Sequence, residues 1–184
     1  MKPHLLTALA GLALMSVGAQ AAAPSPDSPD AKQEAAKLAQ LPPVTPHGPI
    51  DHSGRKQKGR VSFYAHHFTN RKMADGNRFN PNANVAASKT LPLGTTVKVT
   101  NLDSGQSAVA KVEDRGPYVD GRVLDVAPHV ADQIGIGKKG VVPVVVAPIA
   151  VPQPDGAVKL GAGAAEASPG EVEAAVQQTA ARAK

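Results

Sequence analysis

The sequence contains no cysteine and no tryptophan, and aromatic residues make up only 3% of it. Without cysteine the chain has no disulfide, no thiol nucleophile and no thiolate ligand for a metal. It also has no cysteine to which a lipid anchor could be attached. Single-stranded nucleic acids stack on aromatic rings, so the scarcity of such rings argues against nucleic-acid binding. We therefore expect a fold held by packing alone, in a protein that binds no nucleic acid.

The first 21 residues have the layout of a secretory signal peptide. A short basic start at Lys2 and His4 precedes an apolar run over residues 5–17 and the small-x-small cleavage site Ala19-Gln20-Ala21. The apolar run is too short to remain in a bilayer as a permanent anchor. The expectation is cleavage after Ala21 and export, giving a soluble periplasmic protein with no membrane anchor.

Composition divides the rest of the chain into three parts. Residues 22–58 are rich in Pro and Ala without a sustained apolar period, which predicts a disordered linker. Residues 59–147 carry the apolar patterns of a folded domain. Residues 148–184 are again rich in Pro, Ala and Gly, and they are expected to form a disordered low-complexity tail. Its last part, residues 171–184, is compatible with a marginal helix that has nothing obvious to pack on.

Positive charge is concentrated in the predicted domain. The whole chain carries a formal net charge of +5, and between residues 54 and 147 basic residues outnumber acidic ones two to one. A basic exported domain suggests an anionic partner, such as cell-wall glycan or a membrane surface. A solvated basic face that aids solubility accounts for the same charge.

Short alternating stretches dominate residues 59–147. Over residues 95–100, Val97 and Val99 fall on one face, as in a half-buried strand. The turn Asn-Leu-Asp-Ser-Gly follows and residues 107–113 return from it, which predicts a hairpin. Further strands are predicted over residues 59–64, 123–126 and 141–146. Pro143 places the last of these at a sheet edge or a bulge.

One short helix is predicted to begin at Pro128, because proline suits the first helical turn. Val130 and Ile134 lie one turn apart on the same face, and Gly135 ends the helix. Many short strands with one short helix are typical of a small closed barrel or a sandwich. The expected fold class is mainly β, with disordered segments on both sides of the folded domain.

Three segments, taken in order, resemble the rare lipoprotein A (RlpA) family. They are FYAHHFTNRKMADGNRFN over residues 63–80, AASKTLPLGTTVKVTNLDSG over 86–105, and EDRGPYVDGRVLDVAPHVADQIGI over 113–136. The resemblance covers essentially all of residues 59–147. It implies a small six-stranded double-psi β-barrel that acts on peptidoglycan, especially on glycan strands stripped of stem peptides. It implies neither a cofactor nor a metal.

Members of that family act as endolytic lytic transglycosylases, which cleave the bond after N-acetylmuramic acid without water. The C6 hydroxyl of the sugar attacks C1 and leaves a 1,6-anhydro end. This chemistry needs an acid that protonates the leaving oxygen and then accepts the C6 proton. Asp114 matches the aspartate of the family's DRGP motif, so it is the expected catalytic residue. The structural alternative is an ion pair with Arg115 or Arg122, or a turn cap.

Two positions depart from the family pattern. Asn77 stands where the family carries Glu in a Gly-Glu-x-Phe motif, and Ser88 stands where it carries His in an Ala-Ala-His-x-Thr-Leu-Pro motif. Amide and hydroxyl groups form hydrogen bonds but do not exchange a proton near neutral pH. Asn77 and Ser88 are therefore expected to contact substrate rather than to act as acid or base. Three functions stay open, namely an enzyme with one acid, a catalytically silent glycan-binding barrel, and a scaffold for division or envelope proteins.

Four further residues are candidate substrate contacts. Tyr64 and Phe79 are aromatic side chains on which sugar rings could stack, although some of the aromatic residues near the site are expected to be plain core. Arg115 and Asp125 complete the set. A structural bond from Asp125 to Arg122 is the favoured interpretation of that carboxylate, with a site role second. Lys72, Arg78 and Lys89 are expected either to meet the carboxylates of muramic acid or to be solvated surface.

The pair His66-His67 invites a metal interpretation. Adjacent residues of an extended strand point to opposite faces, so the two rings would not chelate one ion together. No further motif of metal-ligand spacing follows. We therefore expect no metal site.

Overall fold

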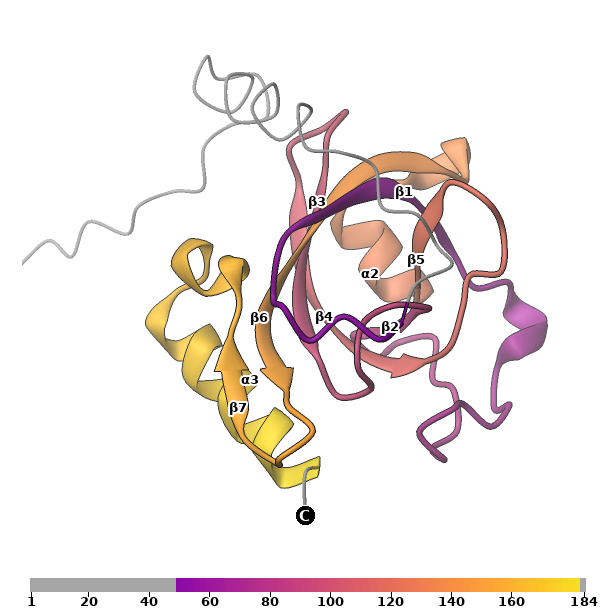
Figure 1. Cartoon of the computed structure of the whole chain (residues 1–184). Helices are drawn as coiled ribbons and strands as arrows, with labels where there is room; N and C mark the ends of the chain where they lie inside the picture. The colour runs from indigo at the N-terminus through magenta and orange to yellow at the C-terminus, as the bar shows by residue number, and fades with distance from the viewer. Residues whose placement is uncertain (1–48, 183–184) are drawn as a thin grey trace, which may run out of the picture.

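The computed structural model describes residues 49–182, so the predicted signal peptide and residues 22–48 of the predicted linker lie outside the described residues. Six strands close into a barrel in the order β1-β5-β2-β4-β3-β6, with β6 pairing back onto β1 (Figure 1). A seventh strand extends the sheet beyond β6. The strands are β1 (Gln57–Phe63), β2 (Val85–Ser88), β3 (Thr96–Asn101), β4 (Ser107–Asp114), β5 (Arg122–Val126), β6 (Val142–Pro152) and β7 (Val158–Leu160).

The barrel is mixed, because β1–β5 and β2–β4 are parallel pairs while the other pairs are antiparallel. The predicted hairpin is confirmed: β3 and β4 pair antiparallel, with Val99 opposite Ala108. Its turn is closed by Asn101, whose side-chain oxygen accepts a 2.9 Å hydrogen bond from the amide of Asp103. Gly105 has φ of 72°, a conformation that favours glycine.

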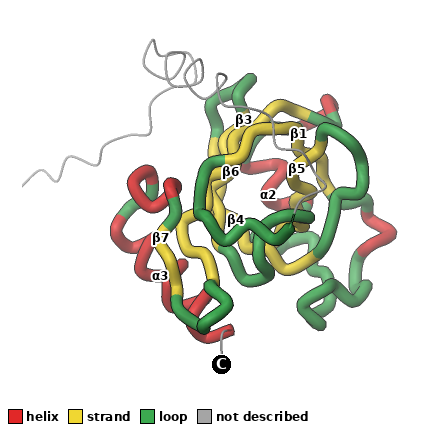
Figure 2. Tube along the Cα trace, in the orientation of Figure 1, coloured by secondary structure: helices red, strands yellow, loops and turns green. Residues whose placement is uncertain are grey.

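The interior of the barrel is filled by aliphatic side chains that alternate along the strands. Val97, Val99 and Val112 are fully buried, as are Val61 and Leu124 on the parallel pair. The predicted helix is confirmed as α2 (Pro128–Gln133), which begins with proline at its first turn. Figures 1 and 2 show α2 behind the ring of strands. Its Val130 and Ala131, together with Ile134 just beyond it, belong to the same core cluster, so α2 closes one end of the barrel.

The prediction that Pro143 marks a sheet edge or a bulge is wrong, because the β1–β6 register runs through Pro143 without a shift and β6 has a neighbour on each side. Strand β6 pairs with β1 on one side and with β3 on the other, and Pro143 lies opposite Arg60. Pro143 is the second residue of β6, one residue before the register with β3 begins at Val144. A missing backbone N–H is tolerated near the first residue of a strand, so β6 remains an interior strand despite its proline.

The expectation of a disordered tail after residue 147 is also wrong. Strand β6 continues to Pro152, β7 pairs with it, and a 3₁₀ turn (Ala162–Glu166) leads into a second helix, α3 (Pro169–Arg182). This helix packs on the outer face of the sheet, where Ala175 is buried against Ile149 and Ala150. The apolar residues of β6 beyond residue 147 give α3 a surface to cover, which composition alone did not show.

Hydrogen bonds fasten this C-terminal unit to the barrel. The hydroxyl of Thr179 donates to the carbonyl of Gly94 at 3.1 Å, and Nζ of Lys98 donates to the carbonyl of Glu166 at 2.8 Å. Part of the predicted linker is ordered as well, since the amide of Asp51 donates to the carbonyl of Thr90 at 2.7 Å and β1 begins at Gln57. Within residues 49–182, no helix has the length and apolar character needed to cross a membrane.

Candidate functional site

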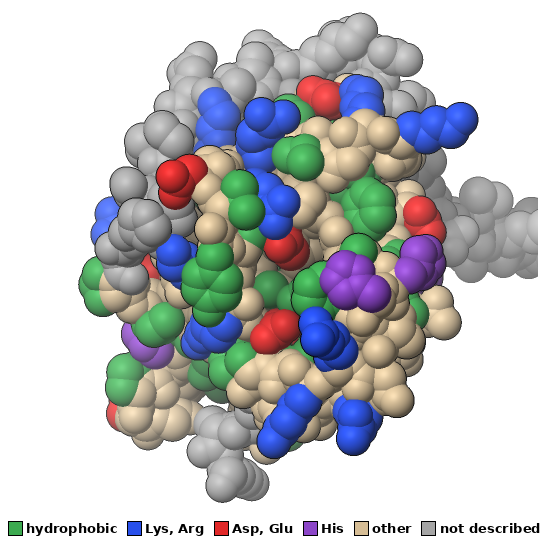
Figure 3. All heavy atoms as spheres, turned by 90° about the vertical axis from the view of Figure 1, so that its right-hand side faces the viewer, with side chains coloured by type: hydrophobic (Ala, Val, Ile, Leu, Met, Phe, Trp, Pro, Cys, Tyr) green, Lys and Arg blue, Asp and Glu red, His purple; other side chains and the backbone are tan. Residues whose placement is uncertain are grey.

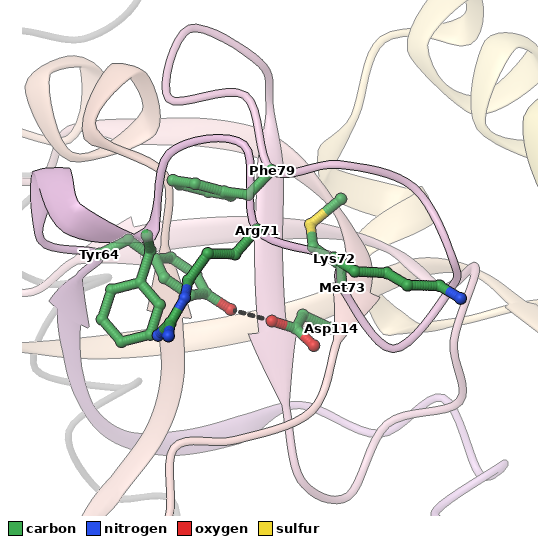
Figure 4. A pocket seen from close by; sticks show the side chains of 7 residues that line it. Tyr64, Arg71, Lys72, Met73, Phe79 and Asp114 are labelled. Atoms are coloured by element: carbon green, nitrogen blue, oxygen red, sulfur yellow. Dashed lines mark hydrogen bonds between the residues drawn. The ribbon is translucent and has the colours of Figure 1, made fainter.

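Asp114 ends strand β4 and lies where three donors converge on its carboxylate. Oδ2 accepts a 2.8 Å hydrogen bond from the hydroxyl of Tyr64, which follows β1 (Figure 4). Oδ1 accepts the backbone amides of Ala74 at 2.9 Å and of Arg115 at 2.8 Å. The expected catalytic carboxylate is therefore held by three chain segments, and its direction is fixed before any ligand binds.

Asp114 lines a pocket of about 340 Å³ whose other walls come from the segment between β1 and β2. The lining residues are Tyr64, Phe68, Arg71, Lys72, Met73, Phe79 and Asp114. Part of the wall is apolar: Phe79 and Met73 are buried, and the ring of Tyr64 lies 4.5 Å from that of Phe79 and 5.5 Å from that of Phe68, centroid to centroid. A carboxylate at the edge of an aromatic wall suits a ligand with both C–H faces and hydroxyl groups.

Two cations stand at the same pocket. Arg71 lies with its guanidinium carbon 5.5 Å from the centroid of the Phe68 ring, and in Figure 4 the Lys72 side chain extends away from Arg71 and Asp114. Figure 3 shows the surrounding face, where acidic side chains lie in a hollow among Lys and Arg side chains. The positive charge of the two pocket cations favours a ligand that carries anionic groups as well as neutral polar ones.

Tyr64 is a constant donor to Asp114. Burial, followed by the hydrogen bond to Asp114 and the charges of Asp114 and Asp125, raises the pKa of Tyr64 well above its ordinary value of 10.0. The phenol therefore keeps its proton at any physiological pH. The predicted site residues Tyr64 and Phe79 both line the pocket with Asp114.

Asn77 lies in the loop beside Asp114 but does not line this pocket. Its side-chain amide donates to Oδ2 of Asp75 at 2.7 Å and its backbone amide to Oδ1 at 2.9 Å. The same loop is fixed next to β4, because the amide of Asp75 donates to the carbonyl of Glu113 at 3.0 Å. Asn77 is thus exposed and lies three residues after Ala74, whose amide binds Asp114. Its side-chain amide points toward Asp75.

Ser88 is fully buried, and its hydroxyl accepts a 3.1 Å hydrogen bond from the amide of Leu91. Arg115 joins the same turn: its Nη1 donates to the carbonyls of Ser88 at 3.0 Å and of Leu91 at 2.6 Å. Burial lowers the pKa of the Arg115 guanidinium. Ser88 and Arg115 therefore brace the loops next to Asp114, and neither lines this pocket.

Asp125 lies on β5, two strands from Asp114. Ala87 of β2 is the register partner of both carboxylates, so Asp114 and Asp125 flank one small residue across the sheet. Oδ1 of Asp125 accepts the hydroxyl of Ser62 at 2.5 Å, and Oδ2 accepts Nη2 of Arg122 at 2.9 Å. The bond to Arg122 that was favoured from the sequence is present. The roles of Asp125 and Arg115 toward a substrate stay predictions.

Sequence reasoning missed Arg71 and Met73 as pocket residues and Asp75 as the partner of Asn77. The Asx-turn pattern Asp75-Gly76-Asn77 was a readable signal for that local bond. No sequence signal marked Arg71 as part of the pocket. His66 and His67 lie in the 3₁₀ turn His66–Phe68, and the ring of His67 stacks 4.3 Å from that of Phe68. Among residues 49–182, no three His, Asp or Glu side chains gather as a metal site requires.

Comparisons with known proteins find relatives of the barrel. A family model described as "Lytic transglycolase" matches residues 56–146. The "Probable endolytic peptidoglycan transglycosylase RlpA" of Synechocystis sp. is 51% identical over 87 residues, which are 47% of this chain and 27% of that protein. The "Endolytic peptidoglycan transglycosylase RlpA" of Pasteurella multocida is 43% identical over 89 residues, 48% of this chain and 30% of that protein. The match thus spans less than a third of the length of these two relatives.

Solved structures with a similar chain trace include the Streptomyces papain inhibitor and an expansin from Clavibacter michiganensis. The inhibitor has a TM-score of 0.41 at 21% identity and covers 51% of this chain and 94% of its own. The expansin has a TM-score of 0.39 at 16% identity and covers 51% of this chain and 50% of its own.

Proposed function

The barrel of this chain belongs to the RlpA-like lytic transglycolase family, and on that premise we propose that the protein binds peptidoglycan glycan strands lacking stem peptides and cleaves them slowly. The proposal includes export to the periplasm through the leader expected over residues 1–21. The observation that carries it is the position of Asp114. It is the one carboxylate among the residues that line the pocket, and it shares that pocket with three aromatic side chains and two cations.

The pocket fits the chemistry of the glycan. The apolar faces of sugar rings pack on aromatic rings such as those of Tyr64 and Phe79, because the ring C–H groups carry partial positive charge and the aromatic face is negative. A strand without stem peptides carries a free lactyl carboxylate on each N-acetylmuramic acid. Arg71 and Lys72 are the pocket residues that would attract that carboxylate.

In the proposed reaction Asp114, in its protonated form, donates its proton to the glycosidic oxygen as the bond from C1 to that oxygen breaks. The N-acetylglucosamine leaving group departs with a hydroxyl. The C6 hydroxyl of N-acetylmuramic acid then attacks C1 and gives its proton to the Asp114 carboxylate, which restores the acid. No water is consumed, and the new end is a 1,6-anhydro sugar.

Tyr64 is a positioning residue in this scheme. Its hydroxyl stabilises the Asp114 carboxylate that exists between the two proton transfers, and its packing against Phe79 keeps that hydroxyl in place. Slow turnover is proposed because Asn77 and Ser88 stand where relatives of this family carry Glu and His. Neither can transfer a proton near neutral pH.

A second candidate function, glycan binding without cleavage, is supported by the bonds around Asp114. Its carboxylate already accepts three hydrogen bonds from the protein. A carboxylate has about four acceptor positions, so capacity is left to bind a sugar hydroxyl, and this role needs no proton transfer. Division or envelope proteins are the third expected class of partner, and no contact in residues 49–182 singles out a surface for them.

Binding is tested by sedimentation of the full chain with sacculi from which stem peptides have been removed by an amidase. We expect the protein to pellet at low salt, to be released as added salt screens Arg71 and Lys72, and to pellet less well with the Arg71→Gln variant. Intact sacculi, whose lactyl groups are amide-linked, serve as the matched control and should retain less protein. Absence of pelleting with peptide-free sacculi at low salt would refute the proposed function in both its forms.

A further inference from the structure

Tyr118 is the most exposed of the large apolar side chains in residues 49–182, with 74% of its surface accessible. It lies in the loop over residues 115–121 that leaves Asp114, and it does not line the pocket described above. Single exposed apolar residues are common on protein surfaces. Tyr118 differs because its loop is braced at its base and a cation lies over its ring.

Lys89 contacts the Tyr118 ring. Its Nζ lies 5.2 Å from the ring centroid, over the ring. Arg115 ties the base of the same loop to the turn that carries Lys89 through its bonds to the carbonyls of Ser88 and Leu91. The loop is therefore braced at its base, and the exposed ring lies next to a cation.

The two walls around Asp114 come from different segments. The pocket is built by residues 64–79, and the Tyr118 loop begins at the residue after Asp114. Figure 1 shows the two segments on the same side of the barrel, flanking the end of β4. A linear ligand that extends from the pocket past Asp114 toward this loop would reach the segment that carries Tyr118.

We propose that Tyr118 and Lys89 form a second glycan subsite, in which a sugar ring stacks on Tyr118 and Lys89 binds the lactyl carboxylate of N-acetylmuramic acid. This subsite rests on the proposed function of the Asp114 pocket and extends it to a longer strand. Stacking supplies affinity for any sugar of the strand. The ammonium group supplies selectivity, because only a strand without stem peptide offers a free carboxylate there.

The test is a calorimetric titration of the full chain with three oligosaccharides. The first is a peptide-free octasaccharide of alternating N-acetylglucosamine and N-acetylmuramic acid, and the second is its tetrasaccharide. The third is an octasaccharide of N-acetylglucosamine alone, which has the same backbone and no lactyl carboxylate. The variants are Tyr118→Ala with Tyr118→Phe as its control, and Lys89→Gln with Lys89→Arg as its control.

For Tyr118→Ala we expect affinity for both octasaccharides to fall about tenfold, a change of about 1.4 kcal/mol, while Tyr118→Phe binds like the unmodified chain. The tetrasaccharide should respond less to Tyr118→Ala than the octasaccharide does, because fewer of its sugars extend beyond the pocket. Lys89→Gln should weaken only the muramic acid octasaccharide, and Lys89→Arg should restore it. Because Tyr118 is exposed, a thermal melt of Tyr118→Ala should match that of the unmodified chain.

Two failures are distinguishable. If the unmodified chain binds no oligosaccharide of either composition, the proposed function fails and the subsite fails with it. If the unmodified chain binds and Arg71→Gln weakens binding, but Tyr118→Ala leaves the octasaccharide affinity unchanged, the pocket stands and the subsite is refuted. Equal loss for tetrasaccharide and octasaccharide in Tyr118→Ala would also refute a separate subsite.

Discussion

The hydroxyl of Tyr64 donates a 2.8 Å hydrogen bond to Oδ2 of Asp114, across a sequence separation of 50 residues. Tyr64 follows the end of β1 and Asp114 ends β4, so the closed barrel is what brings the two together. Burial and the neighbouring carboxylates raise the pKa of Tyr64, which keeps this group a donor. The pair therefore sets the direction of the one carboxylate that lines the pocket.

For Tyr64→Phe we expect slower cleavage with little loss of binding. Phenylalanine keeps the ring that packs against Phe79 and removes only the hydroxyl, and a hydrogen bond to a charged group is worth about 1.5–3 kcal/mol. The rate of anhydro-end formation should fall about tenfold or more. Affinity for the octasaccharide should stay within about twofold of the unmodified chain, because the stacking surface is retained. An equal loss in both quantities would show that Tyr64 acts only as part of the binding surface.

Asn77→Glu should increase cleavage. The residue is exposed, so a longer side chain is accommodated without repacking. A carboxylate at position 77 loses the bond to Asp75 and is repelled by it, which turns the new group away from Asp75. A positioned acid–base group contributes about a hundredfold or more to a rate when well placed, so a gain of about tenfold is expected from an unoptimised site. Asn77→Gln, of the same length and uncharged, is the control and should give no gain.

Ser88→His, by contrast, should destabilise the fold. Ser88 is fully buried and its hydroxyl satisfies the amide of Leu91, so an imidazole there overpacks the site and breaks that bond. Overpacking in a well-packed interior costs about 1–3 kcal/mol, and denaturant unfolding should show a loss of that size. Ser88→Ala, which removes only the hydrogen bond, should lose less. An unfolding free energy equal to that of the unmodified chain for Ser88→His would mean that the site has room for the ring.

The hairpin, several strands and the helix of the barrel could be predicted from the sequence because their signals are local, whereas the choice of a six-stranded barrel over a sandwich rested on the family resemblance. The alternation at Val97 and Val99 predicts strand β3, and the turn after it predicts the return strand β4. Pro128, followed by two apolar residues on one face, predicts helix α2. The C-terminal unit gave weaker signals, since its contact with β6 is made by small side chains such as Ala175 and by the hydroxyl of Thr179. Alanine and threonine are common both in packed helices and in disordered tails, so composition could not reveal that these residues are buried.

One readable signal for α3 was overlooked. The pattern Ser168-Pro169-Gly170-Glu171 is a capping box: Oε2 of Glu171 accepts the Ser168 amide at 2.8 Å and hydroxyl at 2.7 Å. For the site, Asp114 could be predicted because it lies in a motif. The burial of Ser88 and the turn of Asn77 toward Asp75 could not, because both depend on how separate segments pack.

The capping box makes the docking of α3 sensitive to acid. Hydrogen bonds from the amide and then the hydroxyl of Ser168 hold the pKa of Glu171 below its usual value of 4.5. Because the pKa is lower in the folded state, this stabilisation is fully present above that usual value and is lost as pH falls through the folded pKa. For Glu171→Gln we expect a loss of about 1 kcal/mol at neutral pH, typical of a helix cap, and a smaller further loss in acid than the unmodified chain shows. Unfolding free energy measured across the acid range checks this, with Glu173→Gln as the control of equal charge on the same helix.

The most direct test of the proposed reaction is digestion of sacculi stripped of stem peptides by the full chain, with mass analysis of the released strands for 1,6-anhydro-N-acetylmuramic acid ends. We expect slow release of such ends by the unmodified chain and none by Asp114→Asn, while both proteins still sediment with the sacculi. Release that persists in Asp114→Asn would contradict the assignment of the acid. Sedimentation without any anhydro ends, in the unmodified chain and in Asn77→Glu alike, would contradict cleavage and leave a barrel that only binds glycan.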